Sequence, residues 1–350
     1  MGERHADQYG KADGHCPDAT IAADLLLPFV PMSPPTLAPR PPLLFVLNAG
    51  SGSGEAAAAR ELIEAGCDAE HREFHIYEVG AAVGLQACAR QAVEHARALQ
   101  GVVVAAGGDG TINAVAQATL GSGRAFGVLP RGTFNYFSRT HGIPSDSAEA
   151  LQVLLNETPR PVQVGLVNDR VFLVNASLGL YARLLEDRET LKARFGRYRW
   201  VAFWAALMTV LRGARPWYLH LAWHGQQRDI RAQTLFVANN ALQMHQVGVA
   251  QADAPEQGQL AAIVLEPRGA FALLGLLARG ALGRLGAADS VQSFLFESMT
   301  VRPMRGRRSV KVATDGEVGW LQMPLEFRVS AEPLWLVRPE LAPELEATRQ

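Results

Sequence analysis

The sequence has few cysteines, and they form no recognisable pattern. Only Cys16, Cys67 and Cys88 occur in the 350 residues, and no two of them make a CxxC pair. Scattered cysteines in odd number specify no disulfide framework, and a structural zinc site requires closely spaced ligands. The sequence therefore gives no basis for either feature, and we expect the protein to work in a reducing, cytoplasmic compartment.

Long hydrophobic runs are also lacking. The longest candidates, Val201–Leu211 and Ala270–Ala278, fall short of the roughly 18–20 apolar residues of a membrane-spanning helix. The first 20 residues contain acidic side chains and no apolar core like that of a signal peptide. We therefore expect neither a transmembrane segment nor a secretion signal.

The sequence has no excess of charge of either sign. Lys and Arg total 33 against 34 Asp and Glu, which gives a formal net charge of −1. A dedicated nucleic-acid binder carries a basic excess that neutralises phosphates, so this class is excluded. Apolar residues make up 48% and charged residues 19%, which supplies a full core and excludes wholesale disorder. The length allows two domains of ordinary size.

The residue pattern divides the chain into three regions. Residues 1–41 hold a proline-rich stretch that suits neither sheet nor helix, and we interpret them as a disordered extension outside the fold. In residues 42–158, short apolar runs alternate with longer helical patterns, which predicts an α/β domain with a parallel sheet. In residues 159–340, frequent period-two alternation predicts a mostly antiparallel, β-rich second domain.

Three glycine-rich segments follow predicted strands of the α/β domain. They span Asn48–Gly54, Gly107–Thr111 and Pro130–Thr133. The carboxyl ends of parallel strands meet at one edge of the sheet, and glycines there present backbone N–H groups to an anion. Asp109 lies inside the second segment, where a carboxylate would repel a bound phosphate unless Mg²⁺ or a proton intervenes. This combination predicts metal-dependent phosphoryl transfer.

Four sequence motifs resemble those of one family. They are GGDGTINAV (107–115), GVLPRGTFNYFSRTHGIP (127–144), NASLGLYARL (175–184) and VATDGEVG (312–319). Together they are similar to the diacylglycerol kinase catalytic family, which includes bacterial lipid kinases, sphingosine kinases and ceramide kinases. The resemblance covers residues 43–338. It implies an ATP-dependent lipid kinase that transfers the γ-phosphate to a diacylglycerol-like or sphingoid-like hydroxyl in an interdomain cleft.

The resemblance also implies a role for each matched residue. The nucleotide-binding residues are then Asn48, Gly50, Ser51, Gly107, Gly108, Gly110, Thr111, Asn113 and Thr133. Asp109 would bind Mg²⁺ through the ATP phosphates, so ATP and Mg²⁺ are the implied cofactors. Asp315 and Glu317 match the family's carboxylates that are credited with general-base catalysis, in which the acceptor hydroxyl is deprotonated. We favour Glu317, because Asp315 in a D-G-E turn is well placed to cap its own backbone.

The sequence departs from the family pattern in three places. EVGAAVG (78–84) lacks the threonine that often follows the second strand, and Tyr136 replaces the acid of PxGTxND. The auxiliary Mg²⁺ loop DGxLD becomes QGQLA, so Gln257 and Ala261 stand where acids are expected. These two replacements put a structural Mg²⁺ in that loop in doubt, although Asp253 or Glu256 could partly substitute for the missing acids.

Two other functions share part of this pattern. A soluble-substrate kinase of the NAD kinase type also carries GGDGT, but it would not be expected to carry PxGTxNxF. A non-catalytic lipid or nucleotide sensor could keep the fold, as the replaced acids at Gln257 and Ala261 suggest. The retained Asp109, Asp315 and Glu317 argue against the sensor.

Two segments keep two interpretations open. The helical stretch 181–211 places Trp200 and Trp204 on one face, which suits either core packing or an interfacial, lipid-facing helix. The basic run at 302–311 is either a solvated loop or a contact for a lipid headgroup or membrane surface. The expected partners are a lipid substrate and a peripheral membrane surface, with no nucleic acid. The identity of the lipid and a homodimeric state stay open.

Overall fold

The computed structural model describes residues 33–48, 53–80, 82–132, 134–179, 182, 216–247, 258–266, 291–304, 306 and 308–340. Several residues singled out in the sequence lie outside these ranges. They are Gly50, Ser51, Thr133 and Gln257, together with both tryptophans of the 181–211 stretch. What the sequence predicts for these residues stays a prediction.

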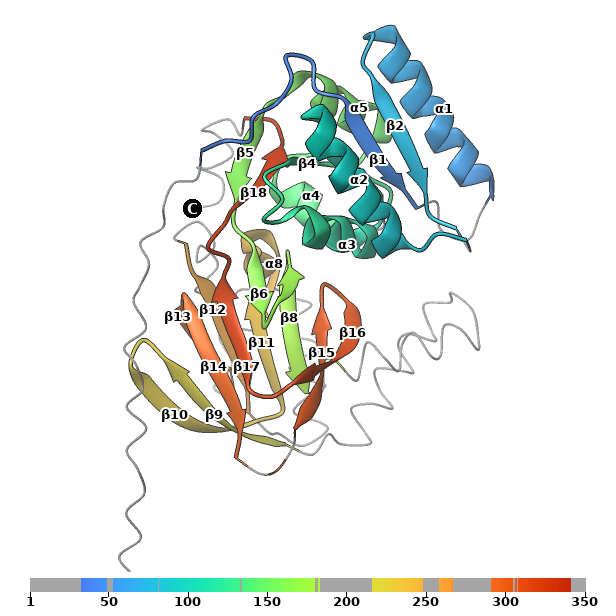
Figure 1. The fold of residues 1–350 in the computed structure, drawn as a ribbon. Helices are drawn as coiled ribbons and strands as arrows, with labels where there is room; N and C mark the ends of the chain where they lie inside the picture. Colours follow the sequence, from blue (N-terminus) through green and yellow to red (C-terminus); the bar gives the residue numbers. More distant parts are fainter. Residues whose placement is uncertain are drawn as a thin grey trace, which may run out of the picture. The chain divides into compact units, whose positions relative to one another are not determined.

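The first sheet has six strands in the order β2-β1-β3-β4-β18-β5 (Figure 1). Their bounds are β1 Leu43–Leu47, β2 Phe74–Glu78, β3 Val102–Gly107, β4 Ala125–Pro130, β5 Pro159–Val162 and β18 Leu334–Val337. Strands β1 to β4 are parallel, and β1, β3 and β4 are buried along their whole length. Such runs of apolar residues suit strands covered on both faces. The parallel α/β sheet predicted from the sequence is therefore confirmed.

Two strands of this sheet come from the region that the sequence assigns to the second domain. β18 pairs in parallel with β4, through Leu336 and Phe126, and it pairs antiparallel with β5. The chain thus returns to the first sheet near its end. The expected boundary between 158 and 159 therefore does not separate the first sheet from the other two, since β5 and β18 lie after it. Pairing between strands so distant in the sequence leaves no local signal from which to predict this.

Helices cover both faces of the first sheet (Figure 1). They are α1 Ser53–Ala69, α2 Leu85–Leu99, α3 Asp109–Thr119, α4 Tyr136–Thr140 and α5 Ser147–Asn156. Helices α2 and α3 pack together against β1 and β3, whereas α5 packs on β4 and contacts α1. None of the helices within the described ranges combines the length and apolar character that crossing a membrane requires.

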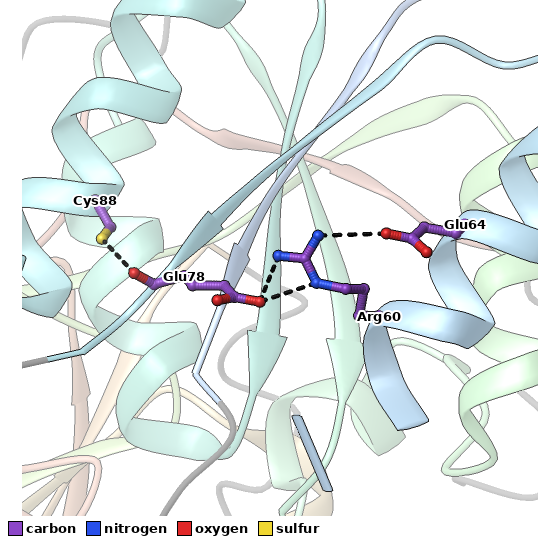
Figure 2. A network of polar contacts seen from close by, with 4 residues as sticks. All are labelled: Arg60, Glu64, Glu78 and Cys88. Carbon is purple, nitrogen blue, oxygen red and sulfur yellow. Dashed lines mark hydrogen bonds and ion pairs between the residues drawn. The ribbon is translucent and has the colours of Figure 1, made fainter. Parts of the chain in front are cut away.

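Arg60 ties α1 to the end of β2 (Figure 2). Its Nε donates to Glu78 Oε1 at 3.0 Å, and its guanidinium reaches Glu64, one turn along α1, at 3.3 Å. Glu78 and, secondarily, Glu64 raise the pKa of Arg60. From α2, the thiol of Cys88 donates to the backbone carbonyl of Glu78 at 3.5 Å. The carboxyl end of β2 is therefore held by two helices.

The second region forms two antiparallel sheets of six strands. One has the order β10-β9-β14-β17-β6-β7, and the other has the order β13-β12-β11-β8-β15-β16. The bounds are β6 Gly165–Val167, β7 Arg170–Phe172, β8 Asn175–Gly179, β9 Trp217–Trp223, β10 Gln226–Ala232, β11 Thr234–Ala238, α8 Ala241–Val247, β12 Leu260–Leu265, β13 Val291–Phe296, β14 Ser298–Pro303, β15 Ser309–Thr314, β16 Glu317–Gln322 and β17 Leu325–Val329. Alternate residues, such as Leu219 and Leu221 of β9, lie in one apolar core to which both sheets contribute. The β-rich second region is therefore confirmed.

Residues 33–42 form no helix or strand, yet they contact the first domain. The Thr36 carbonyl accepts a hydrogen bond from the Arg124 guanidinium at 3.2 Å. The Ala38 N–H donates to the Gln100 carbonyl, also at 3.2 Å. The end of the stretch interpreted as an extension is therefore part of the fold, because its backbone groups find partners that its composition does not reveal. The rest of that stretch lies outside the described residues.

Candidate functional site

Three chain segments converge at the carboxyl edge of β1, β3 and β4. The N–H of Asn48, just after β1, donates to Ala106 at 2.9 Å, and its side-chain amide donates to the Thr111 hydroxyl at 3.0 Å. The N–H of Arg131, just after β4, donates to Gly107 at 2.9 Å. The structure thus brings Asn48, Gly107 and Thr111 together at one edge of the sheet.

Gly108 and Gly132 let two of these loops touch through their backbones. A Cβ atom placed on Gly132 would lie 3.1 Å from Gly108 Cα and 2.8 Å from Asn135 Oδ1, closer than a side chain tolerates without a shift. Asn135 adopts a left-handed φ of 47°, and its amide bridges the N–H and the carbonyl of Gly132. Asn135 therefore fixes the loop after β4 internally, while the Arg131 N–H bond to Gly107 and the approach of Gly132 to Gly108 hold this loop beside the end of β3.

Asp109 is the first residue of α3 and carries an oxygen without a partner. Its Oδ1 is buried and accepts no hydrogen bond from the described residues. Burial raises the pKa of Asp109 above the usual carboxyl value, although nearby backbone N–H groups act against this shift. A buried, unpaired carboxylate oxygen at a helix N-terminus fits Mg²⁺, which prefers hard oxygen ligands.

Glu317 lies beside the same end of α3. It is the first residue of β16, its side chain is exposed, and its Oε1 lies 3.1 Å from the position that a Cβ on Gly110 would take. Gly110 belongs to the first turn of α3, whose N–H groups and helix dipole favour a bound anion. An exposed carboxylate in this position can accept a proton from a hydroxyl that attacks such an anion.

Asp315 lies in the turn before β16, but its carboxylate is fully engaged. Its Oδ1 accepts the N–H groups of Val174 and Asn175 at 2.8 and 3.0 Å. Its Oδ2 accepts the N–H of Leu173 and the side-chain amide of Asn113, both at 2.7 Å. Burial raises the pKa of Asp315, against the lowering effect of these donors. The sequence led us to expect that Asp315 caps its own turn. The structure instead shows its carboxylate holding the neighbouring backbone segment 173–175.

The side-chain amide of Asn113 donates to other groups of the protein, in contrast to the phosphate contact that the resemblance implies. Its Nδ2 donates to Asp315 at 2.7 Å and to the Val171 carbonyl at 3.0 Å. A side-chain amide has two hydrogens to donate, and both are used inside the protein. Asn113 therefore joins α3 to the second region, and it has no amide hydrogen left for a phosphate.

Sequence reasoning missed two parts of this arrangement. One is the run 173–175, whose N–H groups hold Asp315; backbone groups leave no signal in a sequence. The other is Gln117, which lies one helical turn after Asn113 and donates to the Asp169 carbonyl at 3.1 Å. The spacing of four residues between two amides on one helix face is the only signal that could have indicated Gln117.

The family departures also have defined places. Tyr136 begins α4, and its ring stacks parallel to that of Phe134 with centroids 6.1 Å apart. Ala261 is fully buried in β12, paired with Ala238 and Leu295 on the neighbouring strands. Within the part of the chain that the structure describes, no three His, Cys, Asp or Glu residues gather in a way that could hold a metal ion. Ala261 thus offers no ligand where the family has an acid.

Comparisons with known proteins relate the chain to lipid kinases. Residues 42–167 match the family model of the diacylglycerol kinase catalytic domain. The chain is 42% identical over 98 residues to a probable lipid kinase YegS-like of Klebsiella pneumoniae, and 35% identical over 129 residues to a diacylglycerol kinase of Bacillus subtilis. These alignments cover 27% and 36% of this chain, and only 33% and 42% of the two relatives.

A solved structure shows the same fold over a longer stretch. A putative diacylglycerol kinase from Bacillus anthracis superposes with a TM-score of 0.64 at 20% sequence identity. The superposition covers 86% of this chain and 97% of that structure. The likeness therefore extends well beyond residues 42–167, and at this identity it shows the fold alone.

Proposed function

We propose that the protein is an ATP-dependent lipid kinase, because residues 42–167 match the family model of the diacylglycerol kinase catalytic domain. It transfers the γ-phosphate of ATP to a hydroxyl of a diacylglycerol-like or sphingoid-like lipid. One observation carries this proposal: the exposed carboxylate of Glu317 lies beside Gly110, at the end of the helix that begins with Asp109.

The phosphates of ATP bind at the N-terminus of α3. The N–H groups of Thr111 and Ile112 donate to the Gly108 carbonyl at 2.9 and 3.0 Å, whereas an α-helix offers no acceptor to the N–H groups that precede them. The helix dipole adds favourable charge at the same end. Gly107, Gly108 and Gly132 keep the surrounding loops free of side chains, so phosphate oxygens can approach the backbone. Asn48 orients the Thr111 hydroxyl toward the same edge through its 3.0 Å hydrogen bond.

Asp109 would hold Mg²⁺ in this site. Its buried Oδ1 is free of hydrogen bonds from the described residues, which is the condition that a metal ligand needs. Bound Mg²⁺ supplies neutralisation of the charge on the phosphates. The contribution of the protein is to place this oxygen at the first turn of α3 and to keep competing donors away from it.

Glu317 acts as the general base. The O–H bond of the lipid hydroxyl breaks, its proton passes to Glu317, and its oxygen forms a bond with the γ-phosphorus. The bond from the γ-phosphorus to ADP breaks, and ADP leaves with the electron pair. Asp315 cannot take this role while its oxygens accept four hydrogen bonds, and it instead fixes the turn that carries Glu317.

A lipid acceptor requires contact with a membrane surface. Trp320 of β16 is 66% exposed, and its ring centroid lies 5.3 Å from Nζ of Lys311. Met304 and Arg308, in the basic run 302–311, are also exposed. Tryptophan and cations favour the interface of an anionic bilayer, which supports peripheral binding to a membrane.

Lipid phosphorylation by the purified full-length chain tests the proposal. The chain is incubated with radiolabelled ATP, Mg²⁺ and micelles that contain diacylglycerol, ceramide or sphingosine, with soluble NAD as the competing acceptor. Labelled lipid that is lost in Asp109→Asn and kept in Asp68→Asn supports a lipid kinase; Asp68 is an exposed acid at the far end of α1. Label on NAD alone, or on no acceptor, contradicts it.

A further inference from the structure

Helix α3 makes a second polar contact one turn beyond Asn113. Gln117 Nε2 donates to the Asp169 carbonyl at 3.1 Å, and its Oε1 accepts the N–H of Val171 at 2.7 Å. Asn113 donates to the carbonyl of the same Val171 at 3.0 Å. Residues four apart share one face of a helix, so both amides meet β7 together.

Apolar packing fixes the other side of α3. Ile112, Val115 and Ala116 are buried in the core of the first sheet. Leu173 and Val174, which follow β7, belong to the same apolar cluster. A movement of β7 along α3 would therefore break both amide contacts and disturb this shared core.

The strand that α3 contacts is connected to the proposed base through hydrogen bonds to Asp315. The segment 173–175 follows β7 and holds Asp315 through three N–H groups. Glu317 comes two positions after Asp315 in the chain. A shift of β7 relative to α3 would therefore also shift Glu317 relative to the helix end at Gly110.

We propose that Asn113 and Gln117 are positioning residues that set the separation between the phosphate-binding end of α3 and Glu317. This inference rests on the proposed function, because the groups that they position are the phosphate site and the base. Asn113 donates both amide hydrogens within the protein, and Gln117 lies two turns beyond Asp109. A misplacement of about 1 Å can cost about 10²-fold in the rate of a group transfer, so loss of either amide is expected to lower turnover.

Gln117→Met tests the inference, because methionine keeps the length and helix propensity of the side chain and removes both hydrogen bonds. We expect kcat to fall at least about tenfold, while the KM for ATP stays within about twofold of that of the unmodified protein. Gln117→Glu keeps the acceptor for Val171 and loses the donor to Asp169, so its kcat should lie in between. Gln152→Met, at an exposed position of α5, is the matched control and should change neither constant.

Amide hydrogen exchange separates this inference from the proposed function. Peptides that cover residues 168–175 should exchange faster in Gln117→Met than in the unmodified protein, because the strand has lost its hold on α3. If the unmodified protein phosphorylates no lipid, the proposed function fails, and the positioning role in phosphoryl transfer fails with it. If it does phosphorylate lipid, then unchanged exchange with unchanged kcat in Gln117→Met overturns the inference alone. A higher KM for ATP at unchanged kcat also overturns it, since that result assigns Gln117 to nucleotide binding.

Discussion

The side-chain amide of Asn113 donates a 2.7 Å hydrogen bond to the carboxylate of Asp315, although 202 positions separate the two residues in the sequence. Asn113 belongs to the GGDGTIN motif on α3, and Asp315 precedes the strand that begins with Glu317. This contact joins two motifs that the sequence presents as separate. The loop that we propose to bind phosphate and the proposed base are therefore directly connected, and changes to either motif should affect the other.

The unpaired oxygen of Asp109 predicts a trade between activity and stability. Asp109→Asn is expected to lower lipid phosphorylation by at least about 10²-fold, because a charge-organising group is lost from a transfer site. The same substitution should leave the protein as stable or more stable at pH 7, since it removes the charge of a carboxylate whose buried Oδ1 accepts no hydrogen bond from the described residues. Turnover and thermal unfolding of the same preparation measure both effects.

The raised pKa of Asp109 gives this stability difference a pH dependence. In the folded state the carboxyl group binds its proton more tightly than in the unfolded state, where the pKa is about 3.9. The unmodified protein therefore loses stability as the pH rises from that value through the folded-state pKa, whereas the amide of Asp109→Asn does not titrate. The melting temperature of the variant minus that of the unmodified protein should be larger at pH 7 than at pH 4. An equal difference at both pH values contradicts the assignment.

The contact between the two glycine loops predicts a selective loss of nucleotide binding. A Cβ on Gly132 would meet Asn135 Oδ1 at 2.8 Å and Gly108 Cα at 3.1 Å, so Gly132→Ala must push the loops apart. Overpacking of this kind costs about 1–3 kcal/mol of folding stability. If about 1 kcal/mol of it falls on the nucleotide-binding geometry, the KM for ATP should rise about fivefold. Gly84→Ala is the control, because a Cβ there meets no atom within 4 Å in the described structure. Equal KM values for the two variants would count against this loop as the phosphate site.

The contacts of residues 33–42 predict a difference between two truncations. Removal of residues 1–32 keeps the hydrogen bonds from Arg124 to Thr36 and from Ala38 to Gln100, whereas removal of residues 1–41 deletes both. Each hydrogen bond contributes about 0.5–1.5 kcal/mol, so the longer truncation should melt several degrees lower than the shorter one. Identical melting temperatures would show that the segment adds nothing to the fold.

The exposed ring of Trp320 predicts a contribution to membrane binding. Trp320→Ala should reduce sedimentation with vesicles rich in anionic lipid, because the side chain and the neighbouring Lys311 suit the bilayer interface. ATP binding should stay the same, since Trp320 lies on the strand beyond Glu317. Gln322→Ala, at another exposed position of β16, serves as the control. Equal sedimentation of both variants and the unmodified protein would show that Trp320 of β16 does not contribute to membrane binding.

The elements that local patterns determine were predictable from the sequence. Apolar runs such as LLFVL (43–47) and VVVAAG (102–107) are buried strands, and the glycines after them lie at the edge where the loops meet. Alternation in β9 likewise predicts one buried face. These features depend on residues close together in the chain, which is why a single sequence indicates them.

Features that depend on distant pairing were not predictable. β18 returns to the first sheet between β4 and β5, with Leu336 opposite Phe126 of β4, and no local pattern in either strand indicates this pairing. Asp315 looked like a residue that caps its own turn, but its oxygens are occupied by the N–H groups of 173–175. Backbone donors have no sequence signature, so the role of Asp315 could not have been assigned without the fold.

The rate of lipid phosphorylation by Glu317→Gln tests the central claim most directly. The substitution keeps the size of the side chain and removes the group that accepts the proton, so lipid phosphorylation should fall by at least about 10²-fold while ATP binding stays unchanged. Glu326→Gln, at an exposed position of β17, should match the unmodified protein. A Glu317→Gln variant that phosphorylates lipid at the rate of the unmodified protein would contradict the account.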